Sequence, residues 1–497
     1  MCPSITGSVE GDITQTQENT NVNQPPVAVA IDGLRLKFPG ESQIWFNKLS
    51  LTIKQGEKVL LLGASGSGKS TLLQVLSGLI PHSVDVPMKA DHVHIPAHPG
   101  IVFQDPDTQF CMPYVDEELA FVLENRQVPR EEMQAKIREL LSLVGLDFPD
   151  LHTPVQALSQ GMKQRLAIAS VLGVKPSVLF LDEPTALLDK EGTLEVWDTI
   201  RGIAGERTVI IVEHKIDYIL DFVDRIIVLS SEGEIMADGG AEEIFSQHQQ
   251  TITDYGIWHP GIWKNRPRPL RKEKTIAIEK GAEPLLLLQG CMIHRSSKPV
   301  IRAEELQVLP GDFIGITGPN GAGKSSFLLG LMKLLPITGT YLMNGIEPKN
   351  TKQAAQHIAY VFQNPELQFI THSVWNEVEY SLLFEPISKE ERRVRVEELL
   401  RRFHLSGLEN RHPYELSLGQ KRRLSVASAV VRNPRVLLLD EPTFGQDARN
   451  TFAMLDELER LRSEGTAIIM VTHDEEIVAR YCTSVWQAAE GRITTCH

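Results

Sequence analysis

VLLLGASGSGKST, residues Val59–Thr71, is an apolar run followed by a glycine-rich loop, a lysine and two hydroxyl side chains. From Gly63 it fits the pattern G-x-x-x-x-G-K-[ST], in which a loop joins a buried strand to a helix. Backbone N–H groups of such a loop cradle phosphates, its lysine reaches the β- and γ-phosphates, and its serine binds Mg²⁺. The predicted nucleotide-binding residues are Gly63, Ala64, Ser65, Gly66, Ser67, Gly68, Lys69, Ser70 and Thr71.

A second such stretch, FIGITGPNGAGKSS, occupies Phe313–Ser326, and Lys324 follows Lys69 by 255 residues. Four further blocks recur at offsets of 258 or 259, for example Glu183 with Glu441 and His214 with His473. A nearly constant offset indicates duplication of a whole domain rather than a solenoid of short repeats. The second set of predicted nucleotide-binding residues is Gly318, Pro319, Asn320, Gly321, Ala322, Gly323, Lys324, Ser325 and Ser326.

The duplication sets the expected domain organisation. Residues 1–26 are polar and end in two prolines, so we predict a disordered tail. Residues 27–245 and 284–497 are the two predicted domains, of α/β class with buried parallel strands such as VLFL and VLLL and a helical insertion after each phosphate loop. Residues 246–283 form a proline-broken connector, whose Trp258 and Trp263 we expect to pack against a domain.

Composition limits the kinds of function. The 497 residues are 42% hydrophobic and 23% charged, as in a globular protein, and the net charge of −14 argues against a nucleic-acid partner. Five cysteines without CxxC spacing suggest a reducing compartment. No apolar run reaches the ~20 residues that span a bilayer, so we expect any membrane link to run through a partner.

Two acidic pairs, Asp182-Glu183 and Asp440-Glu441, each end a predicted buried strand and precede Pro-Thr. One carboxylate of such a pair can hold Mg²⁺ while its neighbour orients or deprotonates the attacking water. Asp182 and Asp440 are therefore predicted magnesium ligands, together with Ser70 and Ser325, and Glu183 and Glu441 are predicted catalytic residues.

With these motifs, each copy resembles the nucleotide-binding subunit of an ABC transporter. The resemblance implies a P-loop NTPase fold with a RecA-like core and a helical subdomain. The signature loop of that family, commonly LSGGQ, reads LSQGM from Leu158 and LSLGQ from Leu416. Both depart at the third position and the first copy also at the fifth. Both keep the serine and second glycine that the family places against ATP of the opposite cassette, and these residues are Ser159, Gly161, Ser417 and Gly419.

The resemblance implies further roles. Gln104 and Gln363 match loop glutamines that sense Mg²⁺, His214 and His473 match switch histidines at the γ-phosphate, and Asp189 and Asp447 match aspartates that couple the two sites. Phe38 lies where an aromatic ring stacks on adenine, whereas the second copy has none around His294. A head-to-tail pairing of the cassettes would bring Lys69 and Glu183 to the signature at Ser417, and Lys324 and Glu441 to that at Ser159.

The block F-Q-[DN]-P-[DE]-x-Q-F, at Gln104 and Gln363, is similar to that of the ATPases of energy-coupling factor (ECF) importers. This resemblance implies a peripheral ATPase at the cytoplasmic face of the cell membrane, with ATP and Mg²⁺ as cofactors. Its expected partners are a transmembrane coupling protein and a small substrate-binding membrane subunit, and its cargo a vitamin, such as a thiamine precursor, or a metal ion. The alternative is a twin-cassette ATPase acting on ribosomes or DNA, but such relatives carry long charged or coiled-coil linkers.

Overall fold

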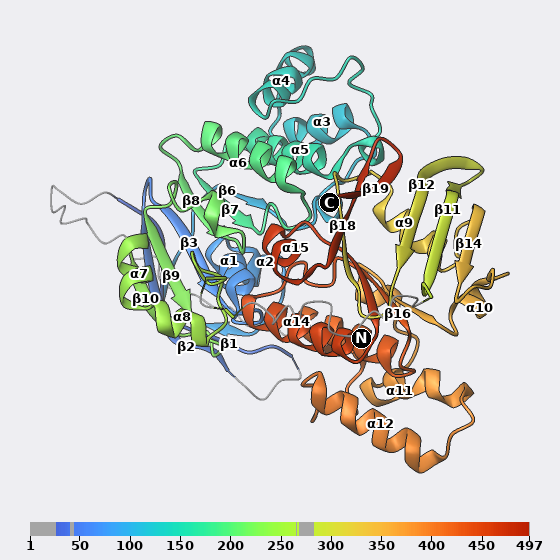
Figure 1. The fold of residues 1–497 in the computed structure, drawn as a ribbon. Coiled ribbons are helices and arrows are strands. Elements are labelled where there is room, and N and C mark those ends of the chain that lie inside the picture. The colour runs from blue at the N-terminus through green and yellow to red at the C-terminus, as the bar shows by residue number, and fades with distance from the viewer. Residues whose placement is uncertain (1–25, 40–43, 265, 268–282, 497) are drawn as a thin grey trace, which may run out of the picture.

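The computed structural model describes residues 26–39, 44–264, 266–267 and 283–496, so the predicted tail lies almost wholly outside the described residues. Figure 1 shows two α/β halves that contact each other, with α3, α4 and α5 at one end of the view and α11 and α12 at the other. The predicted α/β class and the duplication are confirmed.

The first half contains two sheets. Antiparallel strands form the smaller sheet, in which β1 pairs with β2, β4 and β5. The larger sheet has the order β10-β9-β3-β8-β7-β6 and is parallel except for the edge strand β10. The strands are β1 (Val27–Leu36), β2 (Trp45–Lys54), β3 (Lys58–Gly63), β4 (Met88–Lys89), β5 (His92–His94), β6 (Pro99–Val102), β7 (Val178–Asp182), β8 (Thr208–Val212), β9 (Arg225–Leu229) and β10 (Ile235–Gly239).

Helices cover this larger sheet and form the predicted insertion. The insertion comprises α3 and α4, and α5 follows the signature loop. Apolar residues of these three helices join the core cluster that also holds Leu179 of β7 and Trp197 of α6. The helices are α1 (Lys69–Leu76), α2 (Leu79–His82), α3 (Val115–Asn125), α4 (Arg130–Leu143), α5 (Gln160–Gly173), α6 (Lys190–Ala204), α7 (Ala241–Gln247) and α8 (Gln249–Asp254), with short 3₁₀ turns η1 (Pro106–Thr108), η2 (Val155–Ala157) and η3 (Ile216–Tyr218).

In the second half the two sheets merge. Within the described residues they form one nine-stranded sheet of order β14-β11-β12-β19-β18-β13-β17-β16-β15. The parallel pairing of β12 with β19 joins the antiparallel and parallel parts. The strands are β11 (Leu286–Arg295), β12 (Lys298–Val308), β13 (Phe313–Thr317), β14 (Ile337–Met343), β15 (Ile358–Val361), β16 (Val436–Asp440), β17 (Ala467–Val471), β18 (Ser484–Ala489) and β19 (Arg492–Cys496).

The helices of the second half repeat those of the first, with α11 and α12 in the insertion and α13 following the signature loop. They are α9 (Lys324–Leu331), α10 (Thr351–Ala354), α11 (Val374–Glu379), α12 (Lys389–Arg402), α13 (Leu418–Val430), α14 (Ala448–Ser463) and α15 (Glu475–Tyr481), with η4 (Pro365–Leu367), η5 (Tyr380–Phe384) and η6 (Pro413–Glu415).

The central strands explain why the acidic pairs lie where they do. Strand β7 reads VLFLD and lies between parallel neighbours β6 and β8, and β16 reads VLLLD between β15 and β17. Their apolar residues are buried on both faces, as the sequence predicts for parallel strands covered by helices. Each acidic pair therefore emerges at the carboxyl edge of a sheet, beside a phosphate loop.

The predicted domain limits remain predictions. Helix α7 crosses the limit at residue 245, and Ile252 and Ile257 belong to the core cluster of the first half.

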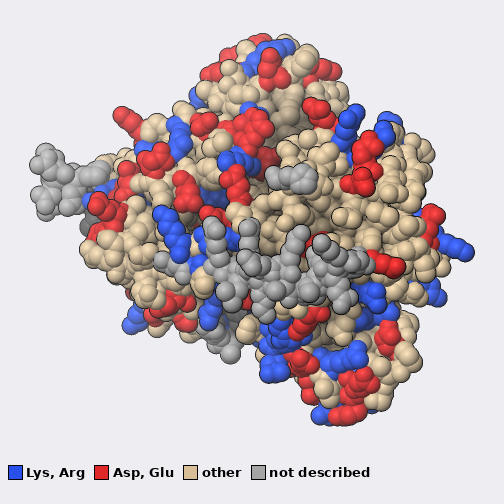
Figure 2. All heavy atoms as spheres, viewed as in Figure 1, with Lys and Arg blue, Asp and Glu red and all other residues tan. Residues whose placement is uncertain are grey.

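The charged surface is mixed on the face shown in Figure 2, where acidic and basic side chains alternate over both halves.

Candidate functional site

The first phosphate loop runs from the end of β3 to the start of α1. Gly66 and Gly68 have φ of 83° and 86°, a region that side chains disfavour, and a Cβ on Gly68 would lie 2.8 Å from the Phe46 ring. Lys69 Nζ donates to the carbonyls of Gly63, at 2.9 Å, and Ala64, at 3.0 Å. Burial lowers the pKa of Lys69, although nearby carboxylates favour the charged form. The glycines and the lysine therefore give the loop the geometry that its sequence predicts.

The second phosphate loop has the same geometry. Lys324 Nζ donates to the carbonyls of Gly318, at 2.7 Å, and Pro319, at 2.8 Å. Gly323, which precedes α9, has φ of 91°. Each loop thus holds a buried ammonium at the start of a helix, where the helix dipole also favours an anion.

The predicted magnesium ligands of the first half are adjacent. Ser70 Oγ donates to Asp182 Oδ1 at 2.8 Å. Burial raises the pKa of Asp182 to about 6, with the Ser70 hydrogen bond opposing the rise. Burial also raises the pKa of Asp440, which is hydrogen-bonded to the predicted ligand Ser325 and accepts from Tyr360 Oη at 3.1 Å. Each half therefore offers carboxylate and hydroxyl oxygens, the donor type that Mg²⁺ prefers, and the residues fit this ion.

The loop interior also fits a polar ligand. The hydroxyl of Ser67 is buried, and it has no hydrogen-bond partner among the described residues. An unpaired buried polar group is costly unless a ligand or water satisfies it. This observation supports a phosphate-binding role for the first loop.

Glu183 and Glu441 follow the buried strands with an unusual backbone. Their φ angles are 48° and 49°, in the left-handed region that non-glycine residues avoid. Such conformations cost of order 1–3 kcal/mol and gather at functional sites. The same conformation in both halves points to a shared geometric requirement for the carboxylate, one that residue types in the sequence do not reveal.

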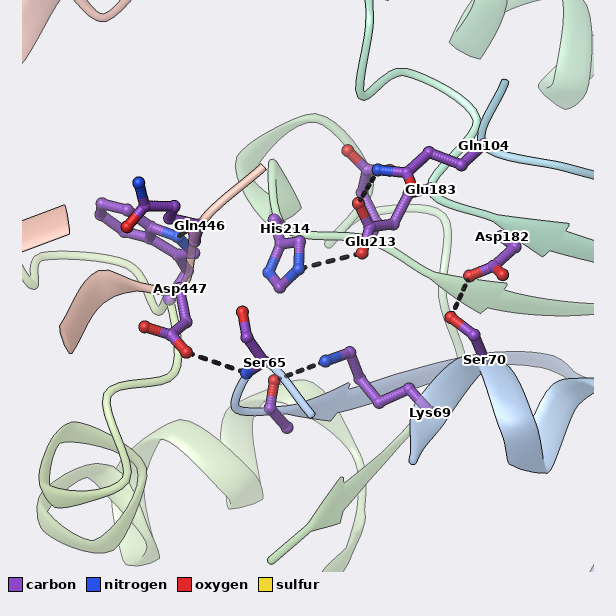
Figure 3. Close-up of polar contacts among 12 residues, drawn as sticks. Ser65, Lys69, Ser70, Gln104, Asp182, Glu183, Glu213, His214, Gln446 and Asp447 are labelled. Atoms are coloured by element: carbon purple, nitrogen blue, oxygen red, sulfur yellow. Dashed lines mark hydrogen bonds and ion pairs between the residues drawn. The ribbon is translucent and has the colours of Figure 1, made fainter. Parts of the chain in front are cut away.

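Each of these carboxylates lies between a loop glutamine and a switch histidine. Gln104 Nε2 donates to Glu183 Oε2 at 2.8 Å, and His214 Nε2 is 3.0 Å from Glu183 Oε1, as Figure 3 shows. Burial alone would raise the pKa of Glu183, but His214 lowers it below its ordinary value. The structure therefore brings together three predicted site residues from three separate loops.

The second half repeats this cluster with longer distances. Gln363 Nε2 donates to Glu441 Oε2 at 3.2 Å, and His473 Nε2 lies 3.2 Å from Glu441 Oε1. His473 Nε2 makes no aligned hydrogen bond to a described residue. Both halves keep the same three groups, so neither site has lost its predicted catalytic carboxylate or histidine.

The two halves contact each other through Asp189 and Asp447, which the family resemblance predicts to be coupling aspartates. The backbone N–H of Ser65 donates to Asp447 Oδ2 at 2.9 Å, as Figure 3 shows, and that of Asn320 donates to Asp189 Oδ2 at 3.0 Å. Each phosphate loop is therefore bonded to the opposite half. A cavity of about 360 Å³ between the halves is lined by residues that include Glu183, His214, Glu441 and His473.

The signature residues lie at helix N-termini. Ser159 caps α5 and Ser417 caps α13, each accepting from the backbone N–H three residues later. Gly161 and Gly419 lie in the first turns of the same helices. The pairing of each signature with the opposite phosphate loop stays a prediction.

Phe38, the predicted adenine-stacking residue, has an aromatic neighbour near the first phosphate loop, Trp45, which the sequence analysis did not single out. Phe38 meets Trp45 edge to face, with ring centroids 6.5 Å apart. A Cβ on Gly68 would also lie 3.7 Å from the Trp45 ring, which places Trp45 beside the loop. Trp45 begins β2, the strand that precedes the phosphate-loop strand β3, and an aromatic residue at that place would have been a usable signal.

Comparison with known proteins agrees with this geometry. The model of the ABC transporter family matches residues 46–186 and 302–444, more than half of the chain. The chain belongs to the ABC transporter family. Its two halves are ABC ATPase cassettes, and membership supports ATP binding and hydrolysis.

Relatives with two cassettes match over almost the whole chain. A Bacillus subtilis ATP-binding protein, YkoD, provisionally named for HMP/thiamine import, is 34% identical over 92% of this chain and 89% of its own length. A protein of Sulfurisphaera tokodaii, provisionally named an ABC transporter ATP-binding protein, is 36% identical over 93% of this chain and 96% of its own.

Among solved structures, an archaeal ribosome recycling factor, aABCE1, in complex with the ribosomal stalk protein aP1, matches with a TM-score of 0.62. It is 22% identical to this chain, and the match covers 93% of this chain and 89% of that one. At this identity the likeness shows the tandem-cassette fold alone.

Among the residues that the structure describes, no helix combines the length and apolar character needed to span a bilayer.

Proposed function

We propose that the chain hydrolyses ATP at two composite sites, each shared between the cassettes. Lys69 and Lys324 bind the phosphates, and the signature residues Ser417 and Ser159 close each site from the opposite cassette. Support comes from the bonds of both coupling aspartates to the opposite phosphate loops. A bound ATP between the cassettes would hold them together, and hydrolysis would release them.

In this proposal, the carboxylates that follow the buried strands catalyse the hydrolysis. Glu183 and Glu441 orient the attacking water and accept its proton, while His214 and His473 contact the γ-phosphate. Mg²⁺, when bound, would neutralise phosphate charge, and Ser70, Asp182 and Gln104, or Ser325, Asp440 and Gln363, would hold it. Both cassettes keep these groups, so we expect both sites to turn over.

We further propose that hydrolysis powers an importer of the ECF type at the cytoplasmic face of the membrane. Its membrane partners would be a transmembrane coupling protein and a small substrate-binding subunit. The observation that carries this proposal is the two-cassette relative named for HMP/thiamine import, which matches over most of both chains. On this basis a vitamin such as a thiamine precursor is the proposed cargo, with a metal ion as the second choice.

An exposed apolar surface supports a membrane-protein partner. After Gln363, Leu367 is 71% exposed and Ile370 62%, and Phe384, which is 73% exposed, contacts the Tyr380 ring. A neighbouring pocket of about 250 Å³ is lined in part by Ile370 and Tyr380. Thr108 and Cys111 occupy the positions of Leu367 and Ile370 in the first cassette. Clustered exposed apolar side chains mark interaction surfaces, so the second cassette offers the more apolar one.

This surface is linked to the signature helices. Lys421 of α13 pairs with Glu366 of η4 at 2.6 Å, and Lys163 of α5 pairs with Asp107 of η1 at 2.7 Å. A partner that moves either loop would therefore pull on the helix whose N-terminus carries the signature serine. These two ion pairs give a physical route between a docked partner and the ATP sites.

The double substitution Leu367→Glu/Ile370→Glu is expected to lower recovery of membrane partners at least tenfold, because it introduces two negative charges into an apolar contact. Binding of ATP to the purified variant is expected to stay within twofold of wild type. The measurement is co-purification in mild detergent alongside a nucleotide-binding titration. The matched change Thr108→Glu/Cys111→Glu tests whether the first cassette contributes equally. Loss of nucleotide affinity in the first variant would contradict this assignment of the surface.

The experiment that tests the importer is purification of the tagged protein from its own cells in mild detergent, with partners identified by mass spectrometry. One polytopic protein together with a small, very hydrophobic subunit would support it. Recovery of ribosomal or DNA-repair proteins without membrane proteins would overturn the import proposal and leave the ATPase in place.

A further inference from the structure

The backbone carbonyl of the residue before each coupling aspartate accepts a side-chain hydrogen bond, and the donor differs between the two cassettes. Leu188 precedes Asp189 and Gln446 precedes Asp447, so the two carbonyls occupy equivalent positions. Lys215 Nζ donates to the Leu188 carbonyl at 2.8 Å, whereas the indole N–H of Trp258 donates to the Gln446 carbonyl at 2.8 Å. The carbonyl before Asp189 is thus held by a residue of its own cassette. The equivalent carbonyl before Asp447 is held by a residue of the connector.

The sequence explains this difference. Lys215 directly follows the switch histidine His214, but the residue that follows His473 is Asp474, which has no donor to offer. Asp474 instead accepts from the backbone N–H groups of Glu476 and Ile477 at the start of α15. The Asp447 loop therefore needs a donor from elsewhere, and the connector supplies it.

Residues 249–263, which we call the strap, are built to reach that loop. Ile252 and Ile257 are buried in the core cluster of the first cassette, and Trp263 packs against that of the second. The N–H of Ala448 donates to the Gly256 carbonyl at 2.9 Å. A Cβ on Gly256 would lie 2.2 Å from the Arg449 Cβ, so only glycine permits this approach. The strap thus contacts the chain on both sides of Asp447.

An aromatic cluster fixes the end of the strap on the second cassette. The rings of Trp258 and Trp263 lie 5.8 Å and 5.0 Å from that of Phe452 on α14, both at steep angles. Arg480 lies over the Trp263 ring at 5.6 Å. Edge-to-face and cation–π contacts of this kind stabilise a defined ring position, which aims the Trp258 indole at the Gln446 carbonyl.

We propose that Trp258 is a positioning residue for the ATP site of the first cassette. It holds the Asp447 loop in the second cassette, and Asp447 accepts from the N–H of Ser65 in the first phosphate loop. The other ATP site has no such support from the strap, because its Asp189 loop is held by Lys215. The two sites are therefore supported separately, and each can be weakened without the other. This inference rests on the proposed roles of the two phosphate loops but not on import.

Hydrogen exchange of the purified full chain, followed by mass spectrometry, tests the inference without relying on hydrolysis. In Trp258→Phe we expect exchange of the amides in residues 63–67 to accelerate about fivefold, the size expected for one lost hydrogen bond. Exchange in residues 318–322 should stay at its wild-type rate. Lys215→Met should give the opposite pattern. Equal acceleration in both phosphate loops, or in neither, would overturn the proposal.

Steady-state ATP hydrolysis supplies the second readout. We expect Trp258→Phe to lower kcat and leave KM for ATP within twofold, because Trp258 supports a loop carbonyl and has no place at the phosphates. The matched control Trp375→Phe also removes an indole N–H, one that donates to Glu379 within α11 and lies outside this cluster, and it should keep kcat within twofold of wild type. A rise in KM without a fall in kcat, or equal effects of the two substitutions, would contradict a positioning role.

Discussion

The double variant Glu183→Gln/Glu441→Gln is expected to lose ATP hydrolysis by about three orders of magnitude while still binding ATP. Each glutamine keeps the size of the side chain and its contact with Gln104 or Gln363 but cannot accept a proton from water. Glu183 and Glu441 both have positive φ, and each carboxylate lies between a glutamine and a histidine. A neutral side chain of the same shape should therefore leave the surrounding geometry intact. The measurement is kcat of the purified protein with a parallel ATP-binding titration.

The single variants separate the two sites. Because both cassettes keep the carboxylate and the histidine, Glu183→Gln and Glu441→Gln should each lower kcat. The control Glu397→Gln removes an exposed carboxylate paired with Arg393 on α12 and should leave kcat within twofold of wild type. Wild-type turnover in Glu183→Gln, together with abolished turnover in Glu441→Gln, would show that only one site works.

Substituting Lys69 by Met is expected to weaken ATP binding at the first site by about 10- to 100-fold, since one charge-assisted contact to phosphate contributes roughly 1.5–3 kcal/mol. Lys69 Nζ lies beneath the loop, donating to the Gly63 and Ala64 carbonyls, and its stem is buried. Methionine keeps most of the stem's length and packing but removes the charge. Titration calorimetry should therefore resolve one weakened and one unchanged site.

Lys324→Met should produce the converse result, and Lys69→Met/Lys324→Met should abolish detectable binding. Lys136→Met is the matched control, since Lys136 is an exposed side chain paired with Glu132 on α4. Equal weakening of both sites by a single lysine substitution would contradict separate nucleotide-binding loops.

Sequence patterns predicted the fold because its determinants are local. The strand–loop–helix signals around Lys69 and Lys324 and the apolar runs before Asp182 and Asp440 depend on residue type and spacing alone. Their repetition at a nearly constant offset then fixed the two-domain organisation. The merging of the sheets in the second half depends on pairing between β12 and β19, which are distant in sequence, and no local pattern encodes it.

The parts of the site that sequence reasoning missed depend on tertiary contacts. The positive φ of Glu183 and Glu441 is imposed by the loop that each must enter, because glutamate itself has no preference for that region. Trp258 was expected only to pack against a domain. Its bond to the Gln446 carbonyl requires the connector to cross between the cassettes, which spacing cannot show.

The central claim is that one chain carries two complete nucleotide sites between its own cassettes. The most direct test is the stoichiometry of MgATP bound at equilibrium by the hydrolysis-deficient variant Glu183→Gln/Glu441→Gln, with its mass in solution measured on the same sample. Two ATP molecules bound to each monomeric chain is the predicted result. A single ATP per chain, or binding that requires two chains to associate, would contradict it.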